Sequence, residues 1–111
     1  MAIPDYQSIM LPLLKLVGDQ EEHSLRQSID ALADEFGLTD AERKELLSSG
    51  QQAVFDNRVG WARTYLKKAG LLEMTRRGCF RITERGLQVL RESPREINAT
   101  FLRRFPEFVE F

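Results

Sequence analysis

The stretch GWARTYLKKAGLLEMTRRGCFRITERG, residues 60–86, decides the fold that we expect for this sequence of 111 residues. A helical pattern runs up to Gly70, and glycine is a common C-terminal stop for a helix. Two short extended runs, Leu71–Met74 and Cys79–Ile82, then lie on either side of a basic turn that contains Gly78. Such a pair of runs around a glycine turn predicts a β-hairpin.

Downstream of the hairpin, the sequence predicts two further helices. Thr83 can cap a short helix over residues 84–91, because a threonine side chain can accept a hydrogen bond from the first turn. Ser93 is followed by a proline and, three positions on, by a glutamate, which together form a capping-box pattern. This pattern predicts a final helix that runs through Leu102 and stops before Pro106.

Upstream of the quoted stretch, apolar residues recur at spacings of three and four over residues 5–17, which indicates an amphipathic helix. Pro12 interrupts it, so we expect a kink or a late start of that helix. A short strand over residues 22–24 leads into a second helix. This helix begins at a capping box on Ser24 and ends at Gly37.

The helix expected over residues 53–69, which follows a short capped helix from Thr39 to about Leu47, has two chemically different faces. When each residue is advanced by ~100°, five apolar residues fall in one arc, which is the expected core face. This core face comprises Phe55, Val59, Ala62, Leu66 and Ala69. The opposite arc holds Asn57, Gly60, Thr64, Lys67 and Lys68, with Trp61 beside it and Arg58 and Arg63 on its flanks.

The formal net charge of −1 hides a strong asymmetry along the chain. Residues 1–53 hold ten acids and four bases, whereas residues 54–95 hold ten bases and four acids. A binding partner responds to the local field of a patch, and an acidic half elsewhere does not cancel that field beyond a Debye length of ~8–10 Å. The basic region therefore predicts a surface that faces nucleic acid.

The order of helix, short strand, helix, helix and hairpin is that of a winged helix-turn-helix with a short inserted helix. We therefore expect an α+β, mostly helical fold with a small β-hairpin wing. Four segments in this order also resemble a specific family, the N-terminal domain of the Mrr-type restriction endonucleases, which are modification-dependent enzymes that cut foreign methylated DNA. The segments are IPDYQSIMLPLL, ALADEFGLT, SGQQAVFDNRVGWARTYLKKAGLLE and RRGCFRITERGLQVL.

The resemblance covers about residues 3–92 and implies a bacterial or archaeal protein. It implies a winged-helix DNA-binding domain over residues 1–92, with residues 93–111 forming a C-terminal helix and the start of a linker. In this family, a separate C-terminal domain carries the nuclease and its metal site of carboxylates and lysine. A divalent metal such as Mg²⁺ would belong to that domain, so no cofactor is expected in this chain.

The residues themselves do not predict catalysis. With only one cysteine, Cys79, and one histidine, His23, the chain cannot form an intramolecular disulfide or a Cys/His zinc site. No acidic residue precedes an E/Q-x-K pattern on an expected strand. We therefore expect this chain not to be an enzyme, although the resemblance implies a parent that is a metal-dependent type IV restriction endonuclease. No apolar run is long enough to span a membrane, so we expect a cytoplasmic protein.

The candidate DNA-binding residues lie on the fourth helix and on the hairpin. A helix fits the major groove, where asparagine suits adenine and arginine suits guanine, and bases on a wing can contact phosphates or the minor groove. The candidates are Asn57, Arg58, Trp61, Arg63, Thr64, Lys67, Lys68, Arg76, Arg77 and Arg81. Trp61 has two possible roles. It could stack on an unpaired base, or it could pack against the wing or the first helix, and packing is the favoured interpretation.

Three functions remain open at this point. The first is a module that positions a separate C-terminal nuclease domain on double-stranded, methylated DNA. The second is a free-standing transcriptional regulator, which would bind two half-sites as a homodimer. The third is a protein-interaction winged helix whose basic face contacts an acidic partner. The aromatic tail, which contains Phe101, Phe105, Phe108 and Phe111, could offer an apolar surface for self-association.

Overall fold

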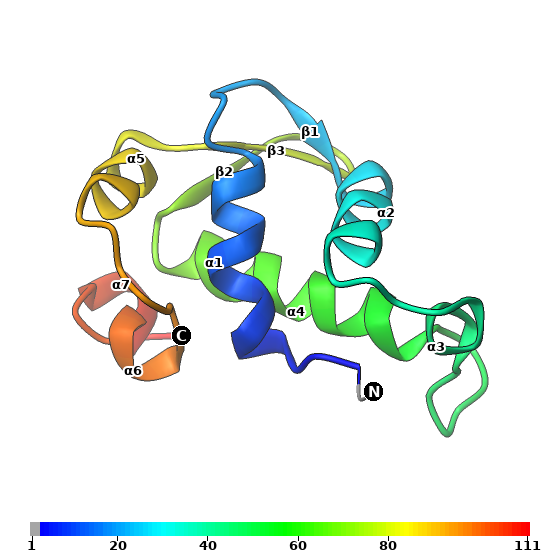
Figure 1. Cartoon of the computed structure of the whole chain (residues 1–111). Coiled ribbons are helices and arrows are strands. Elements are labelled where there is room, and N and C mark those ends of the chain that lie inside the picture. Colours follow the sequence, from blue (N-terminus) through cyan, green and yellow to red (C-terminus); the bar gives the residue numbers. More distant parts are fainter. Residues whose placement is uncertain (1–2) are drawn as a thin grey trace.

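The computed structural model describes residues 3–111, which form helices around a small sheet (Figure 1). In this part of the chain the elements are α1 (Tyr6–Leu16), β1 (His23–Ser24), α2 (Leu25–Glu35), α3 (Asp40–Lys44), α4 (Val54–Lys68), β2 (Leu72–Arg76), β3 (Cys79–Ile82), α5 (Glu84–Arg91), α6 (Ala99–Leu102) and α7 (Pro106–Val109). The expected α+β, mostly helical winged-helix fold is confirmed.

Helix α1 runs through its proline without a late start. The side chain of Asp5 caps the helix by accepting a hydrogen bond from the backbone N–H of Ser8 at 2.7 Å. Pro12 lies in the interior of the helix, so the predicted late start is wrong. Buried residues on both sides of the proline, including Ile9 and Leu13, anchor both halves of α1 in the core. Their burial outweighs the loss of one backbone hydrogen bond at the proline.

The caps of α2 and α3 follow the sequence closely. The Ser24 side chain accepts a hydrogen bond from the N–H of Gln27 in the first turn of α2, and both reciprocal hydrogen bonds of the capping box at Thr39 are present in α3. Helix α3 is shorter than expected, because it ends at Lys44 rather than near Leu47. After Lys44 the chain forms a loop. An isolated antiparallel bridge between Leu46 and Ala53 closes this loop just before α4.

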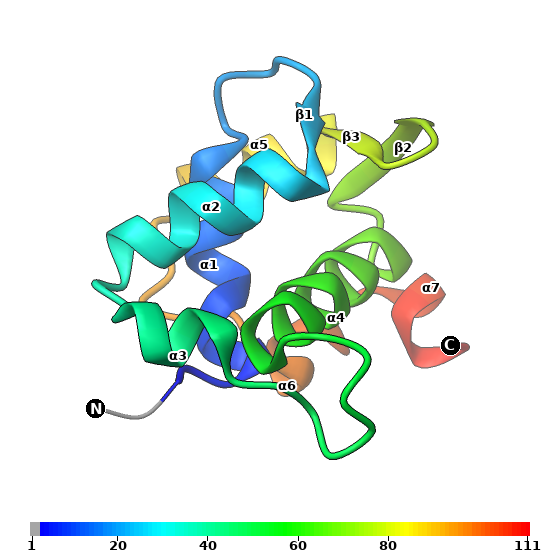
Figure 2. The ribbon, with the colours of Figure 1, turned by 90° about the vertical axis from the view of Figure 1, so that its right-hand side faces the viewer.

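The predicted hairpin is present and belongs to a three-stranded antiparallel sheet of order β1-β3-β2. Gly78 occupies the turn with a φ of 77°, a left-handed conformation that glycine adopts without strain. Its carbonyl accepts a hydrogen bond from the N–H of Leu25 at 2.9 Å, which ties the hairpin to the start of α2. Figure 2 shows the hairpin above the C-terminal half of α4.

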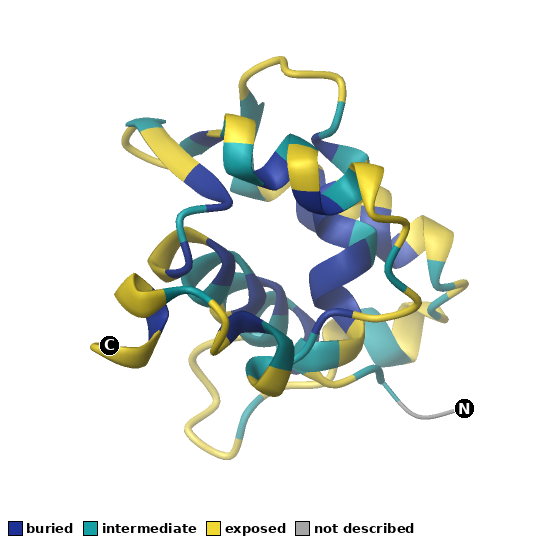
Figure 3. Cartoon of the chain, turned by 90° about the vertical axis from the view of Figure 1, so that its left-hand side faces the viewer, coloured by how far each residue is buried: buried dark blue, intermediate teal, exposed yellow. Residues whose placement is uncertain are grey.

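The core lies where α1 crosses α4 and where both helices meet the sheet (Figure 1). Buried positions lie on the sides of these helices that face one another (Figure 3). The largest fully buried side chains come from α1, α2, α4 and the sheet and include Phe55, Phe80, Leu14, Leu32 and Leu66. One shared core therefore fixes how α4 and the hairpin sit relative to each other.

The predicted final helix from the Ser93 capping box is wrong. Ser93 has a φ of 52°, and its N–H donates to the carbonyl of Leu90 at 3.0 Å, so it completes the end of α5 instead of starting a helix. Asn98 caps α6, a single short turn. Pro106 was expected to follow the last helix, but it occupies the first turn of α7, a position in which its missing N–H is tolerated.

Candidate nucleic-acid interface

Helix α4 has the two faces that its sequence predicts. All five residues of the expected core face are buried to 1% exposure or less. On the opposite arc, Asn57, Gly60 and Thr64 are partly exposed, while Lys67 and Lys68 are exposed. A Cβ atom added at Gly60 would meet no other atom within 4 Å, so the middle of this arc is open. We call Asn57, Gly60, Thr64 and Lys67 the outer arc of α4.

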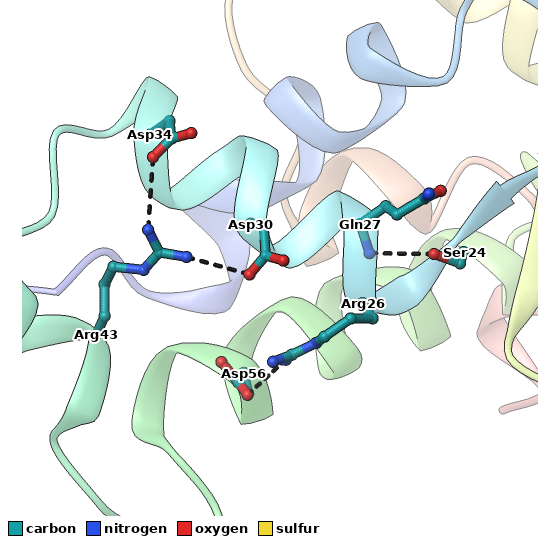
Figure 4. A network of polar contacts seen from close by, with 7 residues as sticks. All are labelled: Ser24, Arg26, Gln27, Asp30, Asp34, Arg43 and Asp56. Atoms are coloured by element: carbon teal, nitrogen blue, oxygen red, sulfur yellow. Dashed lines mark hydrogen bonds and ion pairs between the residues drawn. The ribbon is translucent and has the colours of Figure 1, made fainter.

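Ion pairs that sequence reasoning missed fasten α2, α3 and α4 together (Figure 4). Arg26 on α2 donates to the Asp56 carboxylate on α4 at 2.6 Å. Arg43 on α3 contacts two carboxylates of α2, Asp30 at 3.1 Å and Asp34 at 3.5 Å. Exposed pairs of this kind contribute little stability each. Their effect on the site is electrostatic, because they offset part of the negative charge of three carboxylates on α2 and α4.

Arg58, a predicted DNA contact, is partly buried and holds the N-terminal segment against α4. Its guanidinium donates to the backbone carbonyls of Ile3 at 2.8 Å and Pro4 at 3.2 Å. These carbonyls lie more than fifty positions away in the sequence, so no local pattern could indicate the contact. Arg58 therefore has a structural partner, and its side chain is directed away from the outer arc.

Arg63 is also partly buried, but its Nε has no hydrogen-bond partner in residues 3–111. Burial lowers the pKa of its guanidinium, because removing the charge from water disfavours the protonated form. An arginine in a protein nevertheless stays charged. A buried N–H donor without a partner is unfavourable and would gain from an anionic acceptor. Arg63 stands one turn before Lys67, so these two cations are neighbours on the helix surface.

The candidate residues of the hairpin do not all face the same way. Arg76 is exposed and forms an ion pair with Glu22 at 3.0 Å, which reduces its charge toward a ligand. Arg77, at the tip, is exposed and has no ion pair in the described residues. Arg81 lies between the buried Phe80 and Ile82. Because side chains alternate along a strand, Arg81 points to the face of the sheet away from α4.

Trp61 and Lys68 lie on the other flank of the outer arc, next to aromatic side chains. Trp61 is 49% exposed and meets Tyr65 edge to face, with ring centroids 6.3 Å apart. The Lys68 ammonium lies 5.2 Å from the centroid of the Phe111 ring, within reach of a cation–π interaction. Trp61 therefore packs on Tyr65 of its own helix, and nearly half of its surface remains open.

The arrangement of the helices and of the three-stranded sheet defines this chain as a winged-helix-like α+β domain. The family model of the Mrr N-terminal domain matches residues 6–92, and the chain belongs to that family. The predicted resemblance is thereby confirmed.

A relative in Escherichia coli strain K12, the type IV methyl-directed restriction enzyme EcoKMrr, is 34% identical over 95 residues. The match covers 85% of this chain and 31% of the relative, so the chain spans about a third of that enzyme. No solved structure matches the chain.

Two further features of residues 3–111 bear on the site. No group of three or more histidine, cysteine, aspartate or glutamate side chains in this range is arranged to hold a metal ion. None of the helices in the same range has both the length and the apolar character needed to cross a bilayer.

Proposed function

We propose that this chain is a DNA-binding module that positions a separate nuclease domain on methylated duplex DNA. The observation that carries the proposal is the outer arc of α4. It presents Asn57, Thr64 and Lys67 on the side opposite the core, and none of its residues forms an ion pair with an acid in the described chain. The exposed Arg77 in the turn between β2 and β3 adds a cation at the tip of the hairpin.

In this mechanism, DNA is first captured by charge and then read by α4. Lys67, Arg63 and Arg77 attract the phosphate backbone, and the release of counterions from DNA supplies much of the affinity. The outer arc of α4 then enters the major groove, where the Asn57 amide can form paired hydrogen bonds with an adenine edge. At present the Asn57 amide donates to Gln52 at 3.1 Å, an exposed hydrogen bond that DNA can replace.

The second domain of the proposal comes from the family. The relative is a methyl-directed restriction enzyme about three times as long as the matched region. We propose that the full-length protein is likewise a type IV restriction endonuclease and that residues 93–111 lead toward its nuclease domain. The divalent metal, such as Mg²⁺, would be bound there and not by residues of this chain.

The test is a titration of the chain with duplex DNA at two salt concentrations. Each phosphate contact adds about 0.9 to the slope of log affinity against log salt, so affinity should fall steeply as salt rises. Lys67→Ala should weaken binding and lower this slope by about one unit. Lys15→Ala is the matched control, because Lys15 is exposed on α1, on the other side of the core, and should change neither quantity.

The hairpin is tested by a double substitution, Arg76→Ala with Arg77→Ala. Contacts to phosphates carry no sequence information, so this variant should weaken binding to all duplexes alike. A flat salt response of the parent chain, or a Lys67→Ala variant that binds as the parent does, would reject the proposed function. A changed sequence preference of the double variant would show that the hairpin reads bases.

A further inference from the structure

An aromatic hollow lies beside the outer arc of α4. Tyr6 of α1 and Trp61 and Tyr65 of α4 line a space of about 260 Å³. The ring centroids of Tyr6 and Tyr65 are 4.9 Å apart, and their planes make an angle of 66°. Trp61 and Tyr65 meet at 86°. Because the ring planes are far from parallel, the three rings do not stack on one another but line the sides of a hollow. Sites for drug-sized ligands span roughly 300–1,000 Å³, so this hollow suits a single flat ring system.

Core packing does not account for Trp61. Nearly half of its surface is exposed, whereas the five residues of the α4 core face are almost fully covered. Tyr65 is the one aromatic ring that contacts Trp61 in residues 3–111, and a single neighbour covers at most one of the two faces of an indole. A flat apolar surface therefore remains available to a second ring.

The hollow lies at the edge of the surface that we assign to DNA. On the surface of α4, Trp61 is a direct neighbour of Asn57 and Thr64, which precede and follow it by about one helical turn. Lys68, two turns after Trp61 on the same side, adds a cation that a phosphate could reach. If a duplex binds to the outer arc, a base that leaves the duplex toward this flank would meet Trp61.

We propose that this hollow binds one unpaired nucleobase of the DNA, stacked on Trp61, and that it favours a methylated base. The inference rests on the proposed function, because it requires α4 to lie on DNA. Base–aromatic stacking supplies the main attraction. The hydroxyl groups of Tyr6 and Tyr65 form a hydrogen bond with each other. One O–H donor and several lone pairs of this pair remain for the polar edge of the base. A methyl group on the base would lie against aromatic walls instead of water.

The test compares three duplexes of one sequence that differ at a single position. The first is fully paired, the second carries an unpaired cytosine, and the third carries an unpaired 5-methylcytosine. Trp61 is the one tryptophan of the chain, so intrinsic fluorescence reports stacking on it directly. We expect quenching and at least about fivefold tighter binding with the unpaired cytosine. Burial of the added methyl group should contribute about a further fourfold.

Variants separate the hollow from the rest of the surface. Trp61→Ala should bring the ratio of affinities for unpaired and paired duplexes down to about one, and Trp61→Phe should restore most of the ratio. Val109→Ala is the matched control, because Val109 is an equally apolar and even more exposed residue that does not line the hollow. Thermal melts check that each variant is folded. If Trp61→Ala unfolds early, the fluorescence of the parent chain and the affinities of Trp61→Phe still show whether the hollow binds an unpaired base.

Equal affinity of the parent chain for all three duplexes, with unquenched fluorescence, would overturn the inference and leave the proposed function intact. Absence of salt-dependent binding to any duplex would reject both. A third outcome is a change in oligomeric state of Trp61→Ala, seen by sedimentation, together with no preference for unpaired bases in the parent. This result would make the exposed aromatic face a protein interface and would also overturn the inference.

Discussion

Replacing Gly60 by alanine should stabilise the domain and yet weaken its binding to DNA. Glycine in a helix interior is less stable than alanine by roughly 0.5–1 kcal/mol, because the unfolded glycine has more backbone freedom to lose. Gly60 is helical, and a Cβ atom there meets nothing within 4 Å. The free energy of unfolding of Gly60→Ala should therefore rise by the full amount, about 0.5–1 kcal/mol. For a domain of this size, the melting temperature should increase by about 2–4 °C.

The same substitution at Gly86 is the control for stability, because it also lies in a helix but in a closed environment. A Cβ atom at Gly86 would lie 2.4 Å from the carbonyl oxygen of Leu71 and 2.6 Å from Cγ1 of Ile82. The backbone oxygen cannot easily move aside. Overpacking of this kind typically costs about 1–3 kcal/mol, so Gly86→Ala should lower the melting temperature. Thermal or urea unfolding of the two variants beside the parent measures both effects.

The binding half of the prediction follows from the place of Gly60 at the centre of the outer arc. A methyl group added there would stand between the α4 backbone and any DNA that approaches it closely. Gly60→Ala should therefore bind duplex DNA more weakly than the parent, in the titration that tests Lys67→Ala. A less stable variant would refute the conformational reasoning. A more stable variant with unchanged affinity would show that DNA does not approach α4 at Gly60.

Three further outcomes can be measured on the same chain. Leu66→Ala removes a fully buried side chain from the core face of α4 and should lower the free energy of unfolding by about 2–5 kcal/mol in a urea titration. Arg58→Ala removes two hydrogen bonds from a charged donor to the N-terminal backbone and should cost about 1–3 kcal/mol in the same assay. Hydrogen bonds from Arg104 lower the pKa of Glu92. The stability that Glu92 contributes is therefore present above its unfolded pKa of about 4.3 and is lost as the pH falls through its folded pKa. In melts from pH 7 to pH 3, the melting temperature of Glu92→Gln should fall less than that of the parent.

Much of the fold could be predicted because the signals that specify it are local. The capping box at Thr39 involves residues three positions apart, and both of its hydrogen bonds form. Gly78 has the left-handed φ that the hairpin turn needs. The apolar spacing of α4 identified its core face correctly, since a helix repeats its geometry every 3.6 residues. In each of these cases, the sequence neighbourhood contains both partners of the interaction.

The C-terminal region shows where local signals are ambiguous. The residues around Ser93 satisfy a pattern for the start of a helix, but Ser93 ends α5 with a positive φ. The competing factor is tertiary. Ile97 is 1% exposed, so the irregular segment after α5 places this side chain in the core before Asn98 caps the next helical turn. A helix that began at Ser93 would direct Ile97 to the face set by the helical repeat. The sequence alone does not show whether that helix or the observed irregular segment buries more apolar surface.

The sequence predicts where the bases lie along the chain but not which of them are paired. Counting bases predicts a cationic region over residues 54–95, yet the partners of these bases come from distant parts of the chain. Arg85 pairs with Glu107 at 2.8 Å, and Arg76 pairs with Glu22 across 54 positions. Arg58 is held by backbone carbonyls of the N-terminal segment. Such contacts decide which cations remain available to a ligand, and neither periodicity nor composition contains that information.

The pairing of charges also bears on how a chain with a net charge of −1 could present the cationic surface that we propose. Within the described residues, Arg26 and Arg43 form ion pairs with three carboxylates on α2 and α4. Lys67 and Arg77 have no such acid. Phosphates approaching the outer arc would therefore meet cations whose field is opposed mainly by solvent and salt. For this reason, the salt slope of DNA binding is a more direct measure of the site than the total number of basic residues.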